Sequence, residues 1–260
     1  MKIKAPAKVN IFLKITGTRD NYHTLRSRFV RIDDIYDTIS FNKKDDSENI
    51  YNDFLLECNI ELPGKNTVSF AYELLSEKFN IVKKFFKDYK VILEKRVPHG
   101  AGLGGGSSDA AAFLRLCNEV CELNLNNESL AKIGEKIGAD VPFFIYNYQS
   151  ANVEGIGEIV TPFEETPPKL KLFTPQIHCD TAKVYKTFRK DFYDLVDKNS
   201  GSEWLETDSL TLLNQHKPED LNDLLPAAIK AYPELKTFVT PDYFFSGSGS
   251  TFFKMKFSKN

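Results

Sequence analysis

A glycine-rich run in the middle of the chain carries residue types that bind phosphate. Residues 98–112 read PHGAGLGGGSSDAAA and hold five of the chain's 14 glycines. Glycine lets the backbone approach a ligand closely and adopt a positive φ, at an entropic cost that an ordinary turn does not require. A helical pattern follows at residues 110–123, and a helix N-terminus offers unpaired N–H groups and the positive end of a dipole. The pattern predicts a phosphate-binding loop.

The run does not fit any of three common phosphate-loop motifs. In one case a required residue is missing, and in the other two the rest of the sequence lacks the segments that accompany the motif. A Walker A loop requires a lysine before the Ser or Thr, and here Gly106 precedes Ser107. Gly100, Gly102 and Gly105 match the GxGxxG of dinucleotide-binding folds, but the acidic residues about twenty positions later fall inside a helical pattern. The glycine loop of protein kinases has the same spacing, but no HRD or DFG segment accompanies it.

The run instead resembles the phosphate-binding motif of the GHMP kinases, a superfamily that includes galactokinase and the homoserine, mevalonate and phosphomevalonate kinases. Further segments resemble one member, a kinase of non-mevalonate isoprenoid biosynthesis whose substrate is cytidine diphosphate methylerythritol. These segments, in chain order, are Pro6–Asn10, Asn21–His23, Gly138–Phe144, Glu154–Glu158, Asn222–Leu224 and a third glycine motif at Ser246–Ser250. The resemblance implies ATP-dependent phosphorylation of the 2-hydroxyl group of that substrate.

The resemblance also implies an α+β, two-domain GHMP kinase fold. An N-terminal β/α domain like that of ribosomal protein S5 would span residues 1–160 and carry the phosphate loop. A smaller α+β domain would span residues 161–260, and residues 165–168 (Glu-Thr-Pro-Pro) are the best candidate for the boundary. Independently of the resemblance, strand and helix patterns are mixed without strict βαβ alternation, which favours the α+β class.

ATP-binding residues follow from the resemblance. The hydroxyl groups of Ser107 and Ser108 would donate to the phosphates, and Asn66 and Lys95 would line the adenine pocket. The loop residues of the set are Pro98, Gly100, Ala101, Gly102, Leu103, Gly104, Gly105, Gly106, Ser107 and Ser108. For Asp109 two roles stay open, stabilising the helix N-terminus or contacting ribose or Mg²⁺. Mg²⁺ is expected because it neutralises phosphates in this chemistry, but no set of metal ligands is readable.

Asp140 and Lys8 are the candidate catalytic residues. From the residues alone, Asp140 fits a general base and a loop aspartate in an Asx turn equally well. Lys8 alternates with aliphatic residues in a predicted strand, where a solvated lysine on an edge strand is the common interpretation. The resemblance makes Asp140 the base that accepts the proton of the attacking hydroxyl. It also places Lys8 beside this base, where a cation lowers the pKa of the carboxyl group.

Five residues are assigned to the substrate by the resemblance. Tyr22 and Tyr185 would stack on the two faces of cytosine, and His23 would hydrogen-bond to the edge of the base. Asn10 would hydrogen-bond to the substrate, and Thr181 would make a nearby contact. Stacking of this kind is worth about 1–3 kcal/mol per base in nucleic-acid complexes. Without the resemblance, Tyr22 and His23 after a turn would be interpreted as an exposed aromatic residue and a surface histidine.

The composition and net charge of the chain argue against nucleic acid and membranes as binding partners. A hydrophobic content of 42% and a net charge of −2 are ordinary for a soluble globular protein and give no basic footprint for nucleic acid or an anionic membrane. The N-terminus does not resemble a signal peptide, and no apolar run is long enough to span a membrane, so we expect a cytoplasmic protein. Cys117 and Cys121, one helical turn apart, fit ordinary thiols better than a metal site. The sequence does not indicate an oligomeric state.

The remaining patterns predict the elements that position these residues. Alternating apolar and polar residues indicate strands, and apolar residues at a helical spacing indicate helices. Strands are expected at residues 7–15, 29–32 and 90–95, and a strand pair around 246–249. Helices are expected at 66–79, 110–123, 128–137, 181–188 and 219–232, and a polar surface loop at 43–52.

Overall fold

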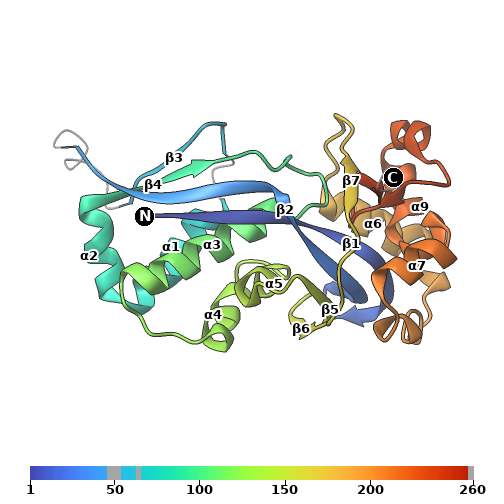
Figure 1. Ribbon diagram of the computed structural model, residues 1–260, viewed down its shortest axis with the longest axis horizontal. Coiled ribbons are helices and arrows are strands. Elements are labelled where there is room, and N and C mark those ends of the chain that lie inside the picture. The colour runs from blue at the N-terminus through green and yellow to red at the C-terminus, as the bar shows by residue number, and fades with distance from the viewer. Residues whose placement is uncertain (46–53, 63–65, 257–260) are drawn as a thin grey trace. The chain divides into compact units, whose positions relative to one another are not determined.

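A computed structural model describes residues 1–45, 54–62 and 66–256 (Figure 1). The chain forms two compact units that are interleaved along the sequence. The first unit contains Met1–Ala7, Ile32–Val97 and Gly105–Asn147, and the second contains Lys8–Arg31, Pro98–Gly104 and Tyr148–Asn260. The paired strands β1 (Lys2–Arg19) and β2 (Tyr22–Lys43) contribute residues to both units. The domain division expected at residue 160 stays a prediction.

The first unit combines a small sheet with helices. β2 pairs antiparallel with β4 (Tyr89–Glu94), and β3 (Leu56–Cys58) pairs parallel with β4. Figure 1 shows α1 and α3 along one face of these strands. The helices of this unit are α1 (Thr67–Lys78), α2 (Asn80–Asp88), α3 (Gly105–Val120), α4 (Asn127–Gly134) and α5 (Val141–Tyr146).

Aromatic rings form much of the core of the first unit. Phe41 on β2, Phe86 on α2 and Phe113 on α3 are buried. The ring centroid of Phe41 lies 5.0 Å from that of Phe86 and 5.7 Å from that of Phe113, both edge to face. Aromatic pairs in this geometry add to the free energy gained from burial alone. The cluster therefore fixes α3, whose first turn lies in the glycine run, against the sheet.

The second unit contains further pairing with β2 and a separate small sheet. β5 (Ser150–Gly155) pairs antiparallel with β2 and with β6 (Ile159–Pro162). The separate sheet has the order β7 (Leu170–Phe173), β9 (Phe252–Met255), β8 (Phe244–Phe245), and α6 packs against α9. The helical segments are α6 (Thr181–Asp191), η1 (Tyr193–Leu195), η2 (Glu203–Leu205), α7 (Ser209–Gln215), α8 (Pro218–Leu221), α9 (Leu224–Ala231) and η3 (Pro233–Phe238).

Most predicted elements are present, and their limits differ for local reasons. The α+β class is confirmed, as are the helices at α1 and α6 and the terminal strand pair, β8 with β9. β1 and β2 extend well beyond the predicted strands. Helix α3 begins at Gly105 rather than at the alanines, because neither Gly105 nor Gly106 adopts a positive φ and both enter the first helical turn. Most of the predicted loop at 43–52 lies outside the described residues.

The helix predicted at 219–232 is divided into α8 and α9 by Asn222. This residue has an extended backbone, with φ −141° and ψ 105°. Its side-chain amide nitrogen donates to the carbonyl oxygens of Phe245 (2.9 Å) and Gly247 (3.0 Å), and its side-chain oxygen accepts from the N–H of Leu224 (2.9 Å). The buried amide thus binds the end of β8 and the glycine motif after it and accepts from the first N–H group of α9, which continuous helix geometry would not allow.

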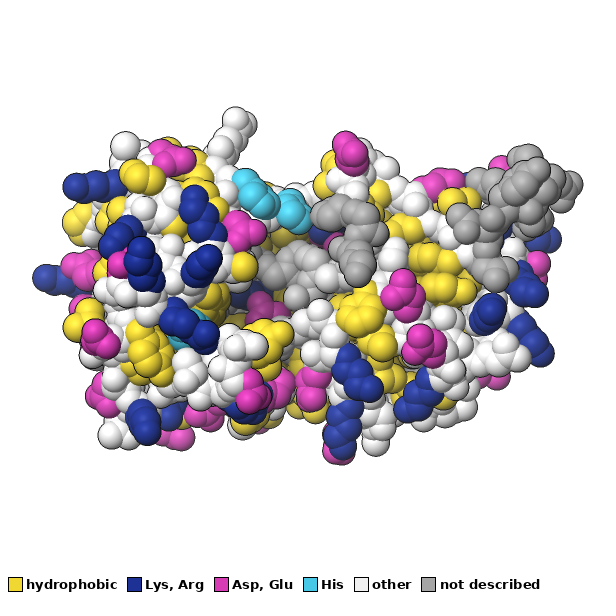
Figure 2. Space-filling view, turned by 180° about the vertical axis from the view of Figure 1, so that it is seen from behind, with side chains coloured by type: hydrophobic (Ala, Val, Ile, Leu, Met, Phe, Trp, Pro, Cys, Tyr) yellow, Lys and Arg dark blue, Asp and Glu magenta, His cyan; other side chains and the backbone are white. Residues whose placement is uncertain are grey.

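Charged side chains of both signs share the surface, and two of the cysteines are buried. Figure 2 shows Lys and Arg side chains interspersed with Asp and Glu side chains on one face. Among the residues that the structure describes, no helix has both the length and the apolar character needed to cross a membrane. Cys117 and Cys121 are buried, and the described part of the chain brings no three His, Cys, Asp or Glu side chains together as a metal site.

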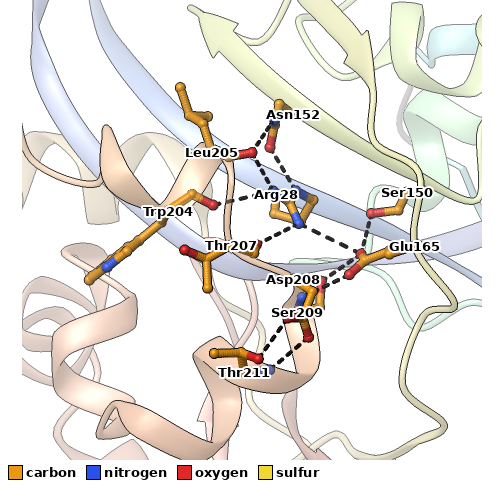
Figure 3. Close-up of polar contacts among 10 residues, drawn as sticks. All are labelled: Arg28, Ser150, Asn152, Glu165, Trp204, Leu205, Thr207, Asp208, Ser209 and Thr211. Atoms are coloured by element: carbon orange, nitrogen blue, oxygen red, sulfur yellow. Dashed lines mark hydrogen bonds and ion pairs between the residues drawn. The ribbon is translucent and has the colours of Figure 1, made fainter.

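Arg28 on β2 is a fully buried cation in the second unit (Figure 3). The N–H groups of its guanidinium donate to oxygen atoms of β5, of η2 and of the segment between η2 and α7. Burial lowers the pKa of Arg28 to about 10, although the nearby carboxylate of Glu165 opposes that shift. The acceptors are Asn152 Oδ1 (2.6 Å) and the carbonyl oxygens of Trp204 (3.2 Å), Leu205 (3.0 Å) and Thr207 (3.2 Å).

Glu165, in the segment predicted to form a domain boundary, is the anionic partner of Arg28. Its Oε1 atom lies 3.7 Å from Nη1 of Arg28. Its carboxylate also accepts hydrogen bonds from the hydroxyl of Ser150 (2.5 Å) and from the N–H (2.7 Å) and hydroxyl (2.6 Å) of Ser209. The pair therefore fixes the start of α7 to the sheet of the second unit, as Figure 3 shows.

Replacement of Arg28 tests this anchor. Arg28→Met should lower the free energy of unfolding by about 3–5 kcal/mol, because it leaves a buried carboxylate uncompensated. Arg26→Met is the matched control, since Arg26 lies on the same strand and pairs with Glu154 at 3.1 Å but is partly exposed. The control should lose about 1 kcal/mol or less. Urea denaturation of both variants gives the comparison, and equal losses would contradict the assignment of Arg28 as the anchor.

Candidate active site

Backbone packs directly against backbone in the glycine loop of the second unit. Gly102 has φ 72°, and a Cβ atom there would lie 2.2 Å from the carbonyl oxygen of Ser246. Gly100 has φ 64°, and a Cβ atom there would lie 2.2 Å from Nδ1 of His178. Only glycine fits such positions. The glycines predicted to bind phosphate therefore also permit a close approach within the protein.

Three motifs that are distant in the sequence meet at this loop. The backbone N–H of Lys8 on β1 donates to the carbonyl oxygen of Leu103 at 2.9 Å. From the C-terminal glycine motif, the hydroxyl of Ser246 donates to the carbonyl oxygen of Gly102 at 3.0 Å. The backbone N–H of Thr251, just after that motif, donates to the carbonyl oxygen of Ala101 at 3.1 Å. The order of motifs along the chain thus corresponds to one packed arrangement in the second unit.

Lys8 and Asn10 are buried side by side on β1. Their exposed fractions are 3% and 2%, which excludes the interpretation of Lys8 as a solvated lysine on an edge strand. The ammonium group of Lys8 donates to Oδ1 of Asn10 at 2.6 Å and lies 4.4 Å from the ring centroid of Phe29. A buried ammonium group is costly unless its hydrogen bonds are satisfied. These contacts account for part of its stabilisation and place the two predicted site residues together.

An aromatic cluster surrounds His23 in the second unit. The imidazole centroid lies 5.4 Å from the ring of Tyr185, 5.7 Å from that of Phe188 and 5.9 Å from that of Tyr193. His23 is buried, so it is not a surface histidine, and its Nε2 atom has no hydrogen-bond partner among the described residues. Burial, with a smaller contribution from the charge of Arg189, lowers the pKa of His23. The imidazole is therefore neutral at neutral pH.

The other two predicted substrate residues of the second unit lie close to this cluster in the sequence. Tyr22, adjacent to His23, is 64% exposed. Thr181 begins α6, the helix that carries Tyr185, and its hydroxyl is 2.9 Å from the hydroxyl of Ser248 in the C-terminal glycine motif. The structure therefore brings His23 and Tyr185 together and links Thr181 to the third glycine motif.

In the first unit, the N-terminus of α3 carries the two predicted phosphate-binding serines. Ser107 and Ser108 lie in the first turn, where backbone N–H groups lack helical partners. The hydroxyl of Ser108 is buried and has no hydrogen-bond partner in the described part of the chain. The hydroxyl of Thr67 at the start of α1 donates to the carbonyl oxygen of Gly106 at 2.7 Å. This contact fixes the beginning of α3 against α1.

Lys95 lies between two buried carboxylates in the first unit. Its ammonium group contacts Oδ2 of Asp37 and lies 2.7 Å from Oδ2 of Asp109. Asp37 also accepts from the backbone N–H of Val97 at 2.8 Å. Burial opposes the charge of Lys95, but the attraction of Asp109 and Asp37 raises its pKa overall. The adenine contact predicted for Lys95 stays a prediction, and its ion pairs are an additional, structural role.

Asp109 has an unusual carboxyl group. It lies beyond the first turn of α3, so it does not have the N-terminal position that one of its two predicted roles requires. Burial raises its pKa to about 7, although Lys95 acts in the opposite direction. Its Oδ1 atom is buried and lacks a hydrogen-bond partner among the described residues. The group therefore titrates near neutral pH, which is typical of a functional region.

Asp140 immediately precedes the short helix α5 in the first unit. Its side chain makes no capping hydrogen bond to that helix. Pro142 lies in the first turn of α5 and limits the backbone there. A Cβ atom on Gly138 would lie 3.6 Å from the hydroxyl of Ser107, so the segment that leads to Asp140 passes close to the first turn of α3.

Asn66 has a structural role that was not predicted. Its Oδ1 atom accepts from the backbone N–H of Ser69 at 2.9 Å and caps α1. Its predicted contact with adenine stays a prediction.

Several neighbours of the predicted site residues were not predicted: Ser27, Asp37, Phe188 and Tyr193. Each is an ordinary residue in its local pattern and becomes informative only through partners distant in the sequence.

Comparisons with known proteins agree with this geometry. Residues 66–148 match the family described as the GHMP kinases N terminal domain. A 4-diphosphocytidyl-2-C-methyl-D-erythritol kinase of Sulfurovum sp. (strain NBC37-1) is 54% identical, with 98% of each chain covered. A kinase of the same name from Sulfurimonas denitrificans is 46% identical over the full length of both chains. The chain belongs to the 4-diphosphocytidyl-2-C-methyl-D-erythritol kinase family.

Solved structures support the fold of this kinase family. A crystal structure of a 4-(cytidine 5'-diphospho)-2C-methyl-D-erythritol kinase has a TM-score of 0.75 and 28% identity, covering 98% of this chain and 90% of that one. The Methanococcus jannaschii mevalonate kinase has a TM-score of 0.63 at 15% identity, with the same coverage, which supports the GHMP kinase fold alone. The predicted family and fold are confirmed, and a GHMP kinase uses ATP as its phosphate donor.

The ionisation of Asp109 can be tested through stability. Its folded pKa of about 7 exceeds the ordinary 3.8, so between these pH values the folded state holds a proton that the unfolded state has lost. The free energy of unfolding should therefore fall as the pH rises through this window. Asp109→Asn removes this contribution. The stability of the wild-type protein minus that of the variant should be larger at about pH 5 than at about pH 8.

Urea denaturation of both proteins at the two pH values gives this difference. The neutral Asn side chain resembles the protonated carboxyl group, so the comparison isolates the ionised form. A difference that grows toward pH 8 would mean that Asp109 is an ionised partner of Lys95 in the folded protein, and the assignment of a raised pKa would be wrong.

Proposed function

We propose that this chain transfers the γ-phosphate of ATP to the 2-hydroxyl of 4-diphosphocytidyl-2-C-methyl-D-erythritol, in the non-mevalonate route to isopentenyl diphosphate, in the cytoplasm. The observation that carries the proposal is 54% identity over 98% of both chains to a kinase of that name. The aromatic cluster around His23 supports it independently, because the proposed substrate carries a pyrimidine base.

Asp140 is the proposed general base. Its carboxylate accepts the proton of the 2-hydroxyl group as the hydroxyl oxygen attacks the γ-phosphorus of ATP. The bond between the γ-phosphorus and the bridging oxygen breaks, and ADP leaves with the electron pair. The place of Asp140 directly before α5, two residues after Gly138, which lies close to Ser107 of α3, supports this role. Phosphoryl transfer requires mainly positioning and charge stabilisation from the protein.

The glycine loop and the first turn of α3 are proposed to hold the phosphates of ATP. Backbone N–H groups at the start of α3 and the hydroxyls of Ser107 and Ser108 are suitable donors to phosphate oxygens. Lys8 contributes a positive charge that stabilises the negative charge of the reacting groups, and Asn10 hydrogen-bonds to the substrate. The burial of Lys8 supports this role, since a cation acts more strongly where water is excluded.

Mg²⁺ is the proposed metal cofactor. It prefers oxygen ligands and usually retains waters while binding one or two carboxylates and the phosphates of the substrate. Asp109, whose Oδ1 atom is buried without a hydrogen-bond partner among the described residues, is a carboxyl group that would fit the ion in its ionised form, and its pKa of about 7 keeps part of it ionised near neutral pH. When bound, Mg²⁺ would neutralise charge on the transferring phosphate.

Cytosine recognition is proposed for His23, Tyr22 and Tyr185. A buried, unpaired imidazole nitrogen is costly, and a hydrogen bond to the edge of a bound base would satisfy it. The two tyrosine rings would stack on the base. Mevalonate and homoserine, the substrates of other GHMP kinases, have no base to occupy such a cluster, and Thr181 provides a further polar contact beside it.

Kinase assays with three acceptors test the proposed substrate. The protein should release ADP from ATP and Mg²⁺ in the presence of the cytidyl substrate, and not with mevalonate or homoserine. Asp140→Asn should lower kcat by about 10²–10⁴-fold, because it removes the base but keeps the shape of the side chain. Nucleotide binding, measured by calorimetry, should be unchanged in this variant.

Two results would contradict these assignments separately. Turnover of mevalonate or homoserine without turnover of the cytidyl compound would reject the substrate. An Asp140→Asn enzyme that retains most of its rate would reject the base and leave the substrate assignment intact.

The protonation of His23 gives a prediction for pH dependence. Because the pKa of His23 is lowered below 6.5, the neutral form persists as the pH falls through that value. KM for the cytidyl substrate should stay constant through pH 6.5 and rise only at lower pH, when a buried cation forms beside the base. His23→Ala should have a raised KM without this inflection. A midpoint at or above pH 6.5 would be inconsistent with a buried, neutral histidine.

A further inference from the structure

A series of hydrogen bonds connects buried side chains of β1 and β2 in the second unit. Ser27 on β2 is fully buried, and its hydroxyl donates to the carbonyl oxygen of Phe12 on β1. The Oγ atom of Ser27 also accepts from Nδ2 of Asn10 at 3.0 Å, and Oδ1 of Asn10 accepts from Nζ of Lys8 at 2.6 Å. Ser27 is therefore two hydrogen bonds away from the ammonium group of Lys8.

The direction of each hydrogen bond is determined by the one before it. A serine hydroxyl has one proton, and here that proton is donated to the carbonyl oxygen of Phe12. The oxygen of Ser27 can then only accept from Asn10, so the NH₂ group of the amide faces Ser27 and the amide oxygen faces Lys8. If the amide were reversed, its NH₂ group would face the ammonium group of Lys8, and its oxygen would face a hydroxyl that has no proton left to donate. Both of these contacts are unfavourable in a buried site.

The surroundings of Asn10 leave its side chain little space for another position. A Cβ atom on Gly247 would lie 3.3 Å from Oδ1 of Asn10. The backbone N–H of Asn10 donates to the hydroxyl of Ser246 at 3.4 Å. The buried amide of Asn10 thus lies against the C-terminal glycine motif, and the hydroxyl of Ser27 determines which of the two ends of the amide faces Lys8.

We propose that Ser27 is a positioning residue for the kinase reaction: its hydroxyl orients the amide of Asn10 and thereby holds the ammonium group of Lys8. The inference rests on the proposed function, in which Asn10 and Lys8 act on the substrate and the reacting groups. Ser27 acts only through them. A displacement of about 1 Å in a positioned group can lower the rate about 10²-fold, so loss of this hydroxyl should affect the chemical step.

Two β-branched substitutions of Ser27 distinguish the effect of its hydroxyl group on activity from the effect of side-chain shape. Ser27→Thr and Ser27→Val add similar volume at this position, but only threonine keeps the hydroxyl group. Ser27→Val should lower kcat by about 10–100-fold with little change in KM for ATP, and Ser27→Thr should retain most of the activity. Equal activity of the two variants, whether high or low, would overturn the proposal.

A double-mutant cycle with Asn10 tests whether Ser27 acts through the amide, and it uses the smaller alanine side chain, which the site accommodates more easily. Ser27→Ala should lower kcat in the wild-type background. In an Asn10→Ala background, the same substitution should have almost no further effect on kcat, because the residue that it orients is already absent. Equal fold-changes in the two backgrounds would show an independent, merely structural effect and would reject the inference.

Ser150→Ala is the matched control. Ser150 is a buried serine on the neighbouring strand β5, and its hydroxyl binds Glu165 rather than a predicted site residue. This variant should have a lower melting temperature and an unchanged kcat. Failure of the proposed function would be visible as a wild-type protein that does not phosphorylate the cytidyl substrate. Failure of this inference alone would be an active wild-type protein with additive Ser27 and Asn10 effects, or a Ser150→Ala variant whose kcat falls as much as that of Ser27→Ala.

Discussion

Close backbone contact between the glycine loop and the segment after β8 determines how the second unit arranges its site residues. Gly102 leaves no space for a side chain beside the carbonyl oxygen of Ser246, and the hydroxyl of Ser246 binds both the loop and the backbone of Asn10. The loop in turn accepts a hydrogen bond from the backbone of Lys8. A side chain at Gly102 would therefore displace the loop and the C-terminal motif, and with them the strand that carries Lys8 and Asn10. The density of glycine in the run reflects this packing as well as the binding of phosphate.

Burial of charge is the second constraint, and the protein satisfies it in different ways. Arg28 binds a carboxylate and several carbonyl oxygens, an arrangement that anchors a segment and leaves few donors for a ligand. Lys95 lies between two carboxylates, which hold β2 and β4 close to α3 within the first unit. Lys8 instead donates to a neutral amide and lies over an aromatic ring. These contacts hold the ammonium group at a buried position, where its charge acts on a phosphate more strongly than it would in water.

Sequence patterns predicted the local features well and the long-range features poorly. The glycine run, the helix that begins after Asn66 and the terminal strand pair all depend on residues near one another in the chain. The resemblance added the family and the candidate residues. Neither source indicated Asp37, which meets Lys95 from 58 positions away, or Ser27, which meets Asn10 from 17 positions away. A single aspartate or serine has no distinguishing pattern in the sequence around it, so the roles of these two residues depend on tertiary contacts. The alternation in β1 was also misleading about exposure, because both faces of the strand are buried around Lys8.

The raised pKa of Asp109 has a consequence for the charge near the proposed phosphate site. Asp37, Lys95 and Asp109 carry a net charge of zero when Asp109 is protonated and of about −1 when it is ionised. An additional negative charge on α3, close to its N-terminus, would reduce the positive potential that the helix dipole offers there and would repel the phosphates of ATP. Burial of the carboxyl group keeps much of this charge absent near neutral pH. The desolvation that makes Asp109 unfavourable for stability thus favours anion binding at the first turn of the same helix. A surface aspartate at this position would have an ordinary pKa and would carry the full charge.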